Sequence, residues 1–205
     1  MNINDIAQIE DFLIKNVEKT LGAASRMTDI IGALIDLKPA AVVGFSSSEM
    51  KKIDCLEFKE MLEKVGLKCV FYYRQMLSFN KLEWHEEIFI SKDFNTAVKL
   101  RNAFIQMWAS LDDFGQVIDQ KTRVKATRQI GKTLGYPNTA IGSFIRNETE
   151  HRSGDDSLTV IGGRCKFFAH SKKHLEKELK SYDRPLDEAV KKYAPKSYKL
   201  SKTMV

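Results

Sequence analysis

The chain has 205 residues, a formal net charge of +6 and a hydrophobic content of 43%. These values are typical of a globular protein with one sizeable core or two small ones. The longest apolar run, residues 40–45, is too short to cross a bilayer, and the first residues lack the order of a signal peptide. Three widely spaced cysteines indicate free thiols and exclude a disulfide framework. We therefore predict a cytoplasmic protein without a membrane partner.

The charge is distributed unevenly along the chain. Residues 1–150 contain 20 basic and 20 acidic side chains, whereas residues 151–205 contain 13 basic and 7 acidic ones. A second local excess of basic residues lies at 121–146. This asymmetry favours an anionic partner such as DNA or RNA. A solubilising lysine-rich tail explains it almost as well.

The N-terminal half predicts two helices followed by a small sheet. Apolar residues recur at helical spacing in residues 4–21 and 25–37. Residues 40–45 and 68–73 predict strands on either side of a helix at 49–65, which together have the size of a right-handed βαβ unit. The serine-rich turn before that helix could bind an anion, but it lacks the glycines and the lysine of a P-loop.

A third strand is predicted at residues 87–91, with a start as early as residue 84, and it forms a hairpin with the strand before it. His85, Glu86 and Glu87 cluster near its start. A histidine beside carboxylates can perform acid–base chemistry. Alternating exposed polar residues on a strand explain the cluster more simply.

Residues 121–134 predict a helix whose basic residues share one face. They recur at spacings of four, three and four, so at 3.6 residues per turn they form a narrow stripe: Lys121, Lys125, Arg128 and Lys132. No acidic residue lies between Asp119 and Glu148. Like charges at i,i+4 destabilise a helix by about 0.2–0.5 kcal/mol per pair. Either an acidic patch or a phosphate-bearing ligand compensates, or the stripe is simply a solvated face.

A tight turn follows this basic helix. The helix is expected to end at Gly135, because the residue just past a helix end often needs a positive φ. The residue before Pro137 is restricted to extended geometry. Asn138 or Thr139 can then cap a second helix, which the polar residues from Asn147 onward are expected to end.

Residues 128–145 resemble a DNA-binding helix-turn-helix. In that motif a small residue, here Gly131, lets the helices approach, and an apolar residue, here Ile141, anchors the second helix. The resemblance implies that four residues lie near base edges: Asn138, Thr139, Gly142 and Ser143. A β-hairpin predicted at residues 157–169 would then be the wing of the motif.

The run Leu-Gly-Tyr-Pro at residues 134–137 carries a second, broader resemblance, to the uncharacterised prokaryotic family called domain of unknown function 483. Members often continue with one variable residue, Cys-Cys, an apolar residue and a later aromatic. Here Thr139 and Ala140 stand at the two cysteine positions, followed by Ile141 and Phe144. The resemblance extends over roughly residues 93–195 and implies no known activity.

The remaining elements complete the predicted fold. They are a helix from Asp93 or Asn95 to Ser110, a connection at 111–120, a polar loop at 148–157, a hairpin at 157–169 with a Gly162-Gly163 turn, and helices at 172–182 and 185–194. We expect a helix-rich α+β fold with a small mixed β-sheet, built from the βαβ unit and hairpins. It forms a single compact domain over residues 1–195, with a loose basic tail over residues 196–205.

His170 and His174 have the i,i+4 spacing that can share a metal, and Cys165 lies nearby. No further local residue completes a set of four ligands. We therefore predict no metal site, and the sequence contains no cofactor fingerprint.

Three functions stay open, and a homo-oligomer is compatible with each. The first is binding of nucleic acid or another phosphate ligand through the basic helix. The second is an enzyme acting on a small phosphorylated or nucleotide-like substrate, which a pocket beside Tyr136, Asn138, Thr139 and His170 would favour. The third is a non-catalytic scaffold with exposed apolar faces on its N-terminal helices. The candidate binding residues are Lys121, Lys125, Arg128, Lys132, Tyr136, Asn138, Thr139 and Ser143.

Overall fold

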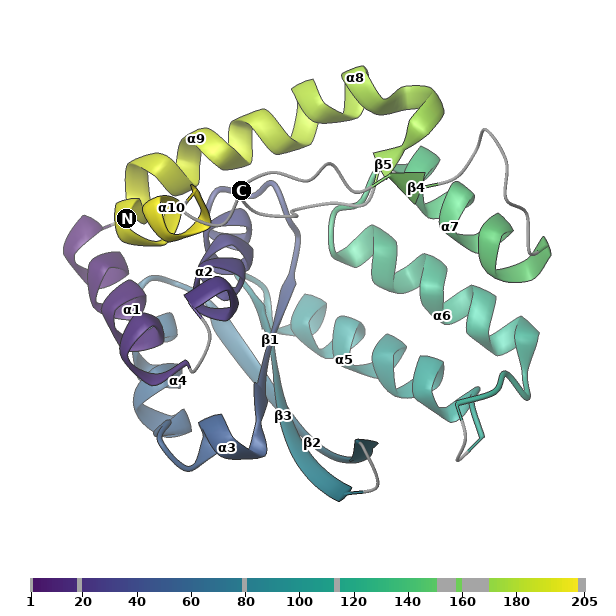
Figure 1. The fold of residues 1–205 in the computed structure, drawn as a ribbon, viewed down its shortest axis with the longest axis horizontal. Helices are drawn as coiled ribbons and strands as arrows, with labels where there is room; N and C mark the ends of the chain where they lie inside the picture. Colours follow the sequence, from purple (N-terminus) through teal and green to yellow (C-terminus); the bar gives the residue numbers. More distant parts are fainter. Residues whose placement is uncertain are drawn as a thin grey trace.

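The computed structural model describes residues 2–17, 20–78, 81–112, 115–150, 158–159 and 170–202. It has the helix-rich α+β fold that the sequence predicts (Figure 1). A three-stranded sheet lies between two groups of helices. The N-terminal helices lie on one side, the helices of residues 94–150 lie on the other, and the C-terminal helices run along one end.

The first two helices are α1 (Ile3–Asn16) and α2 (Thr20–Leu34). The break between them comes earlier than the pattern predicts, because Val17 already has extended backbone dihedrals. Their apolar stripes are fully buried in the main core, which confirms the amphipathic pattern. The stripe residues with 0% exposure are Ile6, Ile9, Leu13, Met27, Ile30 and Ile31.

The sheet consists of β1 (Ala41–Ser46), β2 (Lys68–Ser78) and β3 (Lys81–Ser91) in the order β1-β3-β2. The predicted hairpin between β2 and β3 is confirmed, but both neighbouring pairs are antiparallel, so the expectation of a mixed sheet was wrong. β1 and β2 do run in the same direction, as a βαβ unit requires, but β3 is inserted between them. The connection is therefore a split βαβ crossover.

The crossover contains two helices where one was predicted at 49–65. These are α3 (Ser47–Met50) and α4 (Cys55–Lys64). Asp54 causes the interruption, because its carboxylate accepts hydrogen bonds from the amides of Leu56 and Glu57 and caps α4.

β3 is the central strand because both of its faces are buried. Ile88 and Ile90 point into the main core with α1, α2 and α4. Phe89 points the other way, into a smaller core beneath α5 (Phe94–Ala109). Of the two predicted caps for α5, Asp93 and Asn95, the structure has Asp93, which accepts a hydrogen bond from the amide of Thr96 at 2.8 Å.

After the short predicted connection, α6 (Gln120–Thr133) packs on α5, and α7 (Asn138–Glu150) packs on α6. α6 is capped by Asp119, which accepts from the amide of Thr122 at 2.9 Å. α7 continues beyond Asn147, where the sequence suggested an end. Asn138 is its first helical residue and not its cap.

The C-terminal region starts with a pairing of β4 (Leu158–Thr159) and β5 (His170–Ser171), the two ends of the predicted hairpin. The predicted Gly162-Gly163 turn, most of the loop at 148–157 and Cys165 lie outside the described residues. The chain then continues through the short 3₁₀ helix η1 (Lys172–His174), α8 (Leu175–Glu178), η2 (Leu179–Asp183), α9 (Arg184–Tyr193) and α10 (Pro195–Lys202).

Two predictions for this region need correction. The helix before Pro185 does not stop, because a π turn joins α8 to α9 through a bond from the Arg184 amide to the Leu179 carbonyl. Residues 196–202 are not a loose tail, because α10 packs against α2 and buries Tyr198 in the main core. The Ser197 amide donates to Glu10 Oε1 at 2.6 Å, and both residues are 1% exposed.

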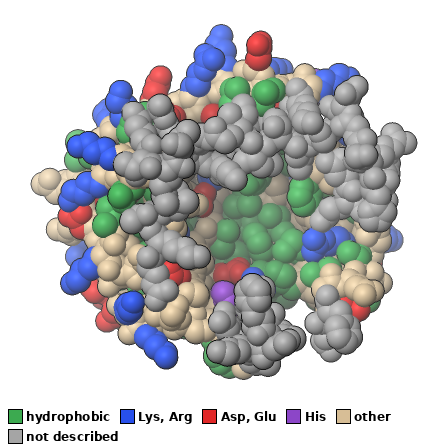
Figure 2. Space-filling model, viewed as in Figure 1, with side chains coloured by type: hydrophobic (Ala, Val, Ile, Leu, Met, Phe, Trp, Pro, Cys, Tyr) green, Lys and Arg blue, Asp and Glu red, His purple; other side chains and the backbone are tan. Residues whose placement is uncertain are grey.

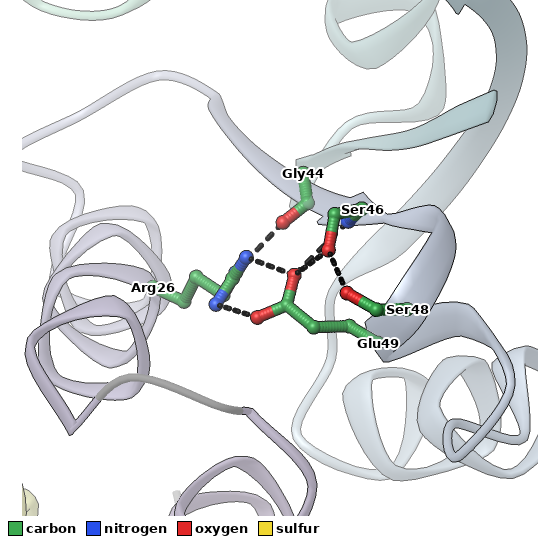
Figure 3. A network of polar contacts seen from close by, with 5 residues as sticks. All are labelled: Arg26, Gly44, Ser46, Ser48 and Glu49. Carbon is green, nitrogen blue, oxygen red and sulfur yellow. Dashed lines mark hydrogen bonds and ion pairs between the residues drawn. The ribbon is translucent and has the colours of Figure 1, made fainter. Parts of the chain in front are cut away.

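A partly buried ion pair fixes α2 to the end of β1 (Figure 3). The Arg26 guanidinium donates to the Gly44 carbonyl at 2.7 Å and to both oxygens of Glu49, at 3.2 and 2.9 Å. The Glu49 carboxylate also accepts from the Ser46 amide at 3.0 Å. Burial alone would raise the pKa of Glu49, but the Ser46 bonds and the Arg26 charge outweigh it and lower the pKa below its usual value.

We expect Arg26→Ala to lower the free energy of unfolding by about 3 kcal/mol, because it leaves a buried carboxylate without its partner. Arg26→Met/Glu49→Leu should lower the free energy of unfolding less than Arg26→Ala alone.

The contribution of Glu49 to the free energy of unfolding is fully present above the pKa of Glu49 in the unfolded chain. It is lost as the pH falls through the lower pKa of the folded state. Chemical denaturation at pH 7 and at pH 3.5 measures both effects, and a pH dependence unchanged in Glu49→Gln would contradict this account.

Candidate functional site

The basic stripe of α6 is exposed along its whole length. Lys121, Lys125, Arg128 and Lys132 are all solvent-exposed, and α6 itself contains no acidic residue. Within the described parts of the chain, none of the four forms an ion pair. The stripe is therefore a run of positive charge without ion pairs on a regular helix, and the cap residue Asp119 lies near its first lysine.

The turn after α6 has the geometry that the sequence predicts. α6 ends at Thr133, and Gly135 has a φ of 78°. A Cβ at Gly135 would lie 2.8 Å from the Leu37 carbonyl oxygen, so the turn is also too close to the α2–β1 connection for a side chain. The Ala40 amide donates to the Thr133 carbonyl at 2.9 Å and holds the two segments together.

The close approach of α6 and α7 that the helix-turn-helix resemblance implies is present. A Cβ at Gly131 would lie only 2.7 Å from Ile141 Cγ1, so no larger residue fits without separating the helices. The local α6–turn–α7 geometry thus depends on the glycine that the motif requires.

The residues that the resemblance places near base edges are only partly accessible. Asn138 and Thr139 are exposed, but Ser143 is 1% exposed. The β5 segment packs along α7, and the Thr139 hydroxyl donates to the buried carboxylate of Glu178. This face of α7 is therefore partly covered, which differs from a helix that lies in a major groove.

Instead, the start of α7 borders a polar cavity of about 290 Å³. Arg146 Nη2 donates to Ser143 Oγ at 3.2 Å on one wall, and the 3₁₀ turn η1 supplies the opposite wall. The described lining contains an arginine, a lysine and a histidine but no carboxylate. It consists of Asn138, Thr139, Gly142, Ser143, Arg146, Lys173 and His174. His174 therefore lies at this cavity, whereas nothing is described of the side chain of His170.

A second, apolar cavity of about 220 Å³ lies between α5, α6 and α7. Tyr136 lines it and is partly buried, and burial raises the pKa of its hydroxyl. Figure 2 shows a hollow with a hydrophobic floor on the face of the molecule where α5 and α6 lie. At 3.6 residues per turn, the α7 residues that line the apolar cavity lie opposite those that line the polar one. Helix α7 therefore separates the two cavities.

The cluster of His85, Glu86 and Glu87 is divided by the sheet. Glu86 points into the main core side and accepts a hydrogen bond from the Cys55 thiol. Glu87 points toward α5, where it accepts from Arg74 Nε at 2.8 Å. Burial raises the pKa of Glu87, and the Arg74 charge opposes this effect. The two carboxylates therefore cannot act together on one substrate.

Sequence reasoning missed several residues at these sites. Arg123 and Thr127 line the apolar cavity, and Arg146 and Lys173 line the polar one. The helical period of α6 could have placed Arg123 and Thr127 on one face. No local signal brings Lys173 to α7, because the two are joined only by tertiary packing.

No family model, no curated protein and no solved structure matches this chain. The resemblances to a helix-turn-helix and to domain of unknown function 483 therefore stay predictions. In the described residues, no helix is long and apolar enough to cross a membrane. The same residues contain no group of three or more His, Cys, Asp or Glu side chains arranged for a metal ion.

The described cysteines are expected to be chemically inert. Burial, then the hydrogen bond to Glu86 and nearby negative charge, raises the pKa of Cys55 to about 12. Burial and the Glu63 charge raise the pKa of Cys69 to about 12. In a Cys165→Ser background at pH 8, both thiols should react with a disulfide reagent roughly 1,000-fold more slowly than in the unfolded chain, because only the thiolate attacks. Absorbance of the released thiol measures the rate, and a folded-state rate near the unfolded one would contradict the burial of these groups.

Proposed function

We propose that this protein binds the phosphate backbone of a nucleic acid through the exposed basic face of α6. The observation that carries the proposal is the unpaired stripe of Lys121, Lys125, Arg128 and Lys132. The stripe contains two i,i+4 pairs of like charge, each of which costs the helix about 0.2–0.5 kcal/mol. A polyanion removes this repulsion and releases counterions on binding.

The dimensions of the stripe fit a nucleic-acid backbone. Eleven residues of rise separate Lys121 from Lys132, which is about 16 Å along the helix axis. This length matches about five nucleotides of one strand at 3.4 Å each. Because Ser143 is buried and the adjacent face of α7 is partly covered, contacts to the backbone fit this surface better than base readout.

The scaffold hypothesis receives less support. It required broad apolar faces on the N-terminal helices, but the apolar stripes of α1 and α2 are buried in the main core. Backbone binding therefore accounts for more of the described surface.

We expect Lys125→Ala/Arg128→Ala to weaken binding to DNA and RNA oligonucleotides regardless of sequence. The slope of log K against log[salt] should fall by about 1.4–1.8, because two phosphate contacts are lost. Fluorescence anisotropy between 50 and 200 mM salt measures both quantities. A matched control is Lys51→Ala/Lys64→Ala, which removes two exposed lysines from α3–α4 and should leave the slope unchanged. Equal slopes in the two double variants, or no binding by the wild type at low salt, would rule out the α6 interface.

The polar cavity supports a second candidate function, the binding of a small phosphate ester. Its lining combines positive side chains from two elements with the N-terminus of α7. The hydrogen-bond ladder of α7 starts with the bond from the Ile141 amide to the Pro137 carbonyl, so the amides before Ile141 have no partner within the helix. Helix N-termini of this kind favour phosphate groups.

Asn138→Asp tests this second function with little risk to the fold. A carboxylate in the first turn suits the helix dipole but repels a phosphate in the cavity. Ribose 5-phosphate should bind the wild type, and Asn138→Asp should weaken it at least tenfold in titration calorimetry. Asn95→Asp, the same change at an exposed residue in the first turn of α5, is the control and should bind as the wild type does. Equal affinities for ribose 5-phosphate and ribose would exclude a phosphate site here.

A further inference from the structure

One side chain that lines the apolar cavity has a buried hydroxyl group without a hydrogen-bond partner among the described residues. Thr127 is 9% exposed, and its hydroxyl oxygen has no hydrogen-bond partner within the described structure. Buried hydroxyl groups without partners are costly and rare in native proteins. Thr127 lines the cavity between α5, α6 and α7, so a molecule in that cavity can supply the missing partner.

Another threonine of the same helix shows the usual arrangement. Thr133 is 7% exposed, and its hydroxyl donates to the Gln129 carbonyl at 2.8 Å and accepts from Gln129 Nε2 at 3.0 Å. The hydroxyl of a helical threonine normally donates a hydrogen bond in this way, to the carbonyl four residues earlier. Thr127 makes no such bond, although it occupies the same helix.

Arg123 places a positive charge beside this hydroxyl. It lies one turn before Thr127 on α6, and both residues line the cavity. An arginine and a hydroxyl donor at one end of a site are well suited to a carboxylate, which accepts hydrogen bonds through both oxygens. Most of the remaining lining is apolar: Met107, Ile130, Gly131, Leu134, Ala140, Ile141, Phe144 and the ring of Tyr136.

We propose that this cavity binds a small carboxylic acid with an apolar body, such as an aryl acid. The carboxylate lies at Arg123 and accepts the hydrogen bond from Thr127, while the apolar body lies between Leu134, Ile141 and Phe144. An apolar cavity of about 150 Å³ holds benzene. The cavity of about 220 Å³ therefore accommodates an aromatic ring with a short acidic arm.

This site is independent of the proposed nucleic-acid surface. At 3.6 residues per turn, the cavity residues of α6 lie on the side opposite its basic stripe. A small acid in the cavity leaves the stripe free. Loss of one activity therefore leaves the other measurable in the same variant.

The test compares phenylacetate with its uncharged counterpart phenylacetamide, using titration calorimetry and ligand-observed NMR on the full chain. Phenylacetate should bind with a Kd on the order of millimolar, and phenylacetamide should bind at least tenfold more weakly. Thr127→Val keeps the side-chain shape and removes the hydroxyl. It should bind phenylacetate about tenfold more weakly, with an unfolding temperature no lower than that of the wild type, because it removes an unsatisfied buried group.

Thr133→Val is the matched control on the same helix. It should lower the unfolding temperature, because it breaks two hydrogen bonds, and it should leave phenylacetate binding unchanged. Ala140→Leu fills the cavity from α7 and should abolish binding while the chain stays folded. If it unfolds the chain, Thr127→Val decides the question alone. The proposal is overturned if the wild type does not bind phenylacetate, if both probes bind equally, if Thr127→Val binds like the wild type, or if Thr127→Val is clearly less stable.

Discussion

The contact between Gly131 and Ile141 sets the distance between α6 and α7, and the candidate sites depend on that distance. A side chain at position 131 would collide with Ile141 at 2.7 Å. Because the helices are this close, the apolar residues of both form one wall of a small cavity, and the turn at Gly135 fits against the α2–β1 connection. The opposite face of α6 is left to solvent, and the opposite face of α7 borders the polar cavity. A single close approach thus produces three surfaces of different chemistry.

Basic side chains in other parts of the described structure form ion pairs, whereas those of the α6 stripe do not. Elsewhere in the described structure, basic side chains that support the fold have acidic partners: Arg26 with Glu49, Lys38 with Asp29, Arg74 with Glu87 and Lys196 with Asp11. Two of these pairs, Arg26 with Glu49 and Lys196 with Asp11, join segments that are distant in the sequence. The four basic residues of α6 have no such partners among the described residues. This contrast is the reason to interpret the stripe as a binding surface and not as part of the scaffold.

Local sequence signals predicted the parts of the fold that depend on neighbouring residues. The positive φ of Gly135, the cap at Asp93 and the small residue at Gly131 each follow from a short pattern, and the structure contains all three. The order of the strands could not be predicted in this way, because β3 pairs with residues of β1 that lie 39 to 49 positions earlier in the chain. The burial of α10 was missed for a related reason. Its buried positions include Ser197 and Ser201, which carry no apolar signal, and its lysines resemble a disordered tail.

The cavities were the hardest feature to predict from the sequence. Residues from separate elements form them, and no single residue type indicates a cavity. Thr127 shows what the structure adds. Four other side chains also have a buried oxygen without a hydrogen-bond partner among the described residues: Glu86, Glu87, Asp183 and Ser197. Glu86 and Glu87 each have a second oxygen that accepts a hydrogen bond. Ser197 has a single side-chain oxygen, as Thr127 does, but it lines neither the polar nor the apolar cavity. Thr127 has one side-chain oxygen only, and it lines a cavity together with Arg123, which is positively charged at neutral pH. Among the unsatisfied hydroxyl groups of the described structure, it is therefore the one that lies at one of the two cavities, where a ligand can supply the missing partner.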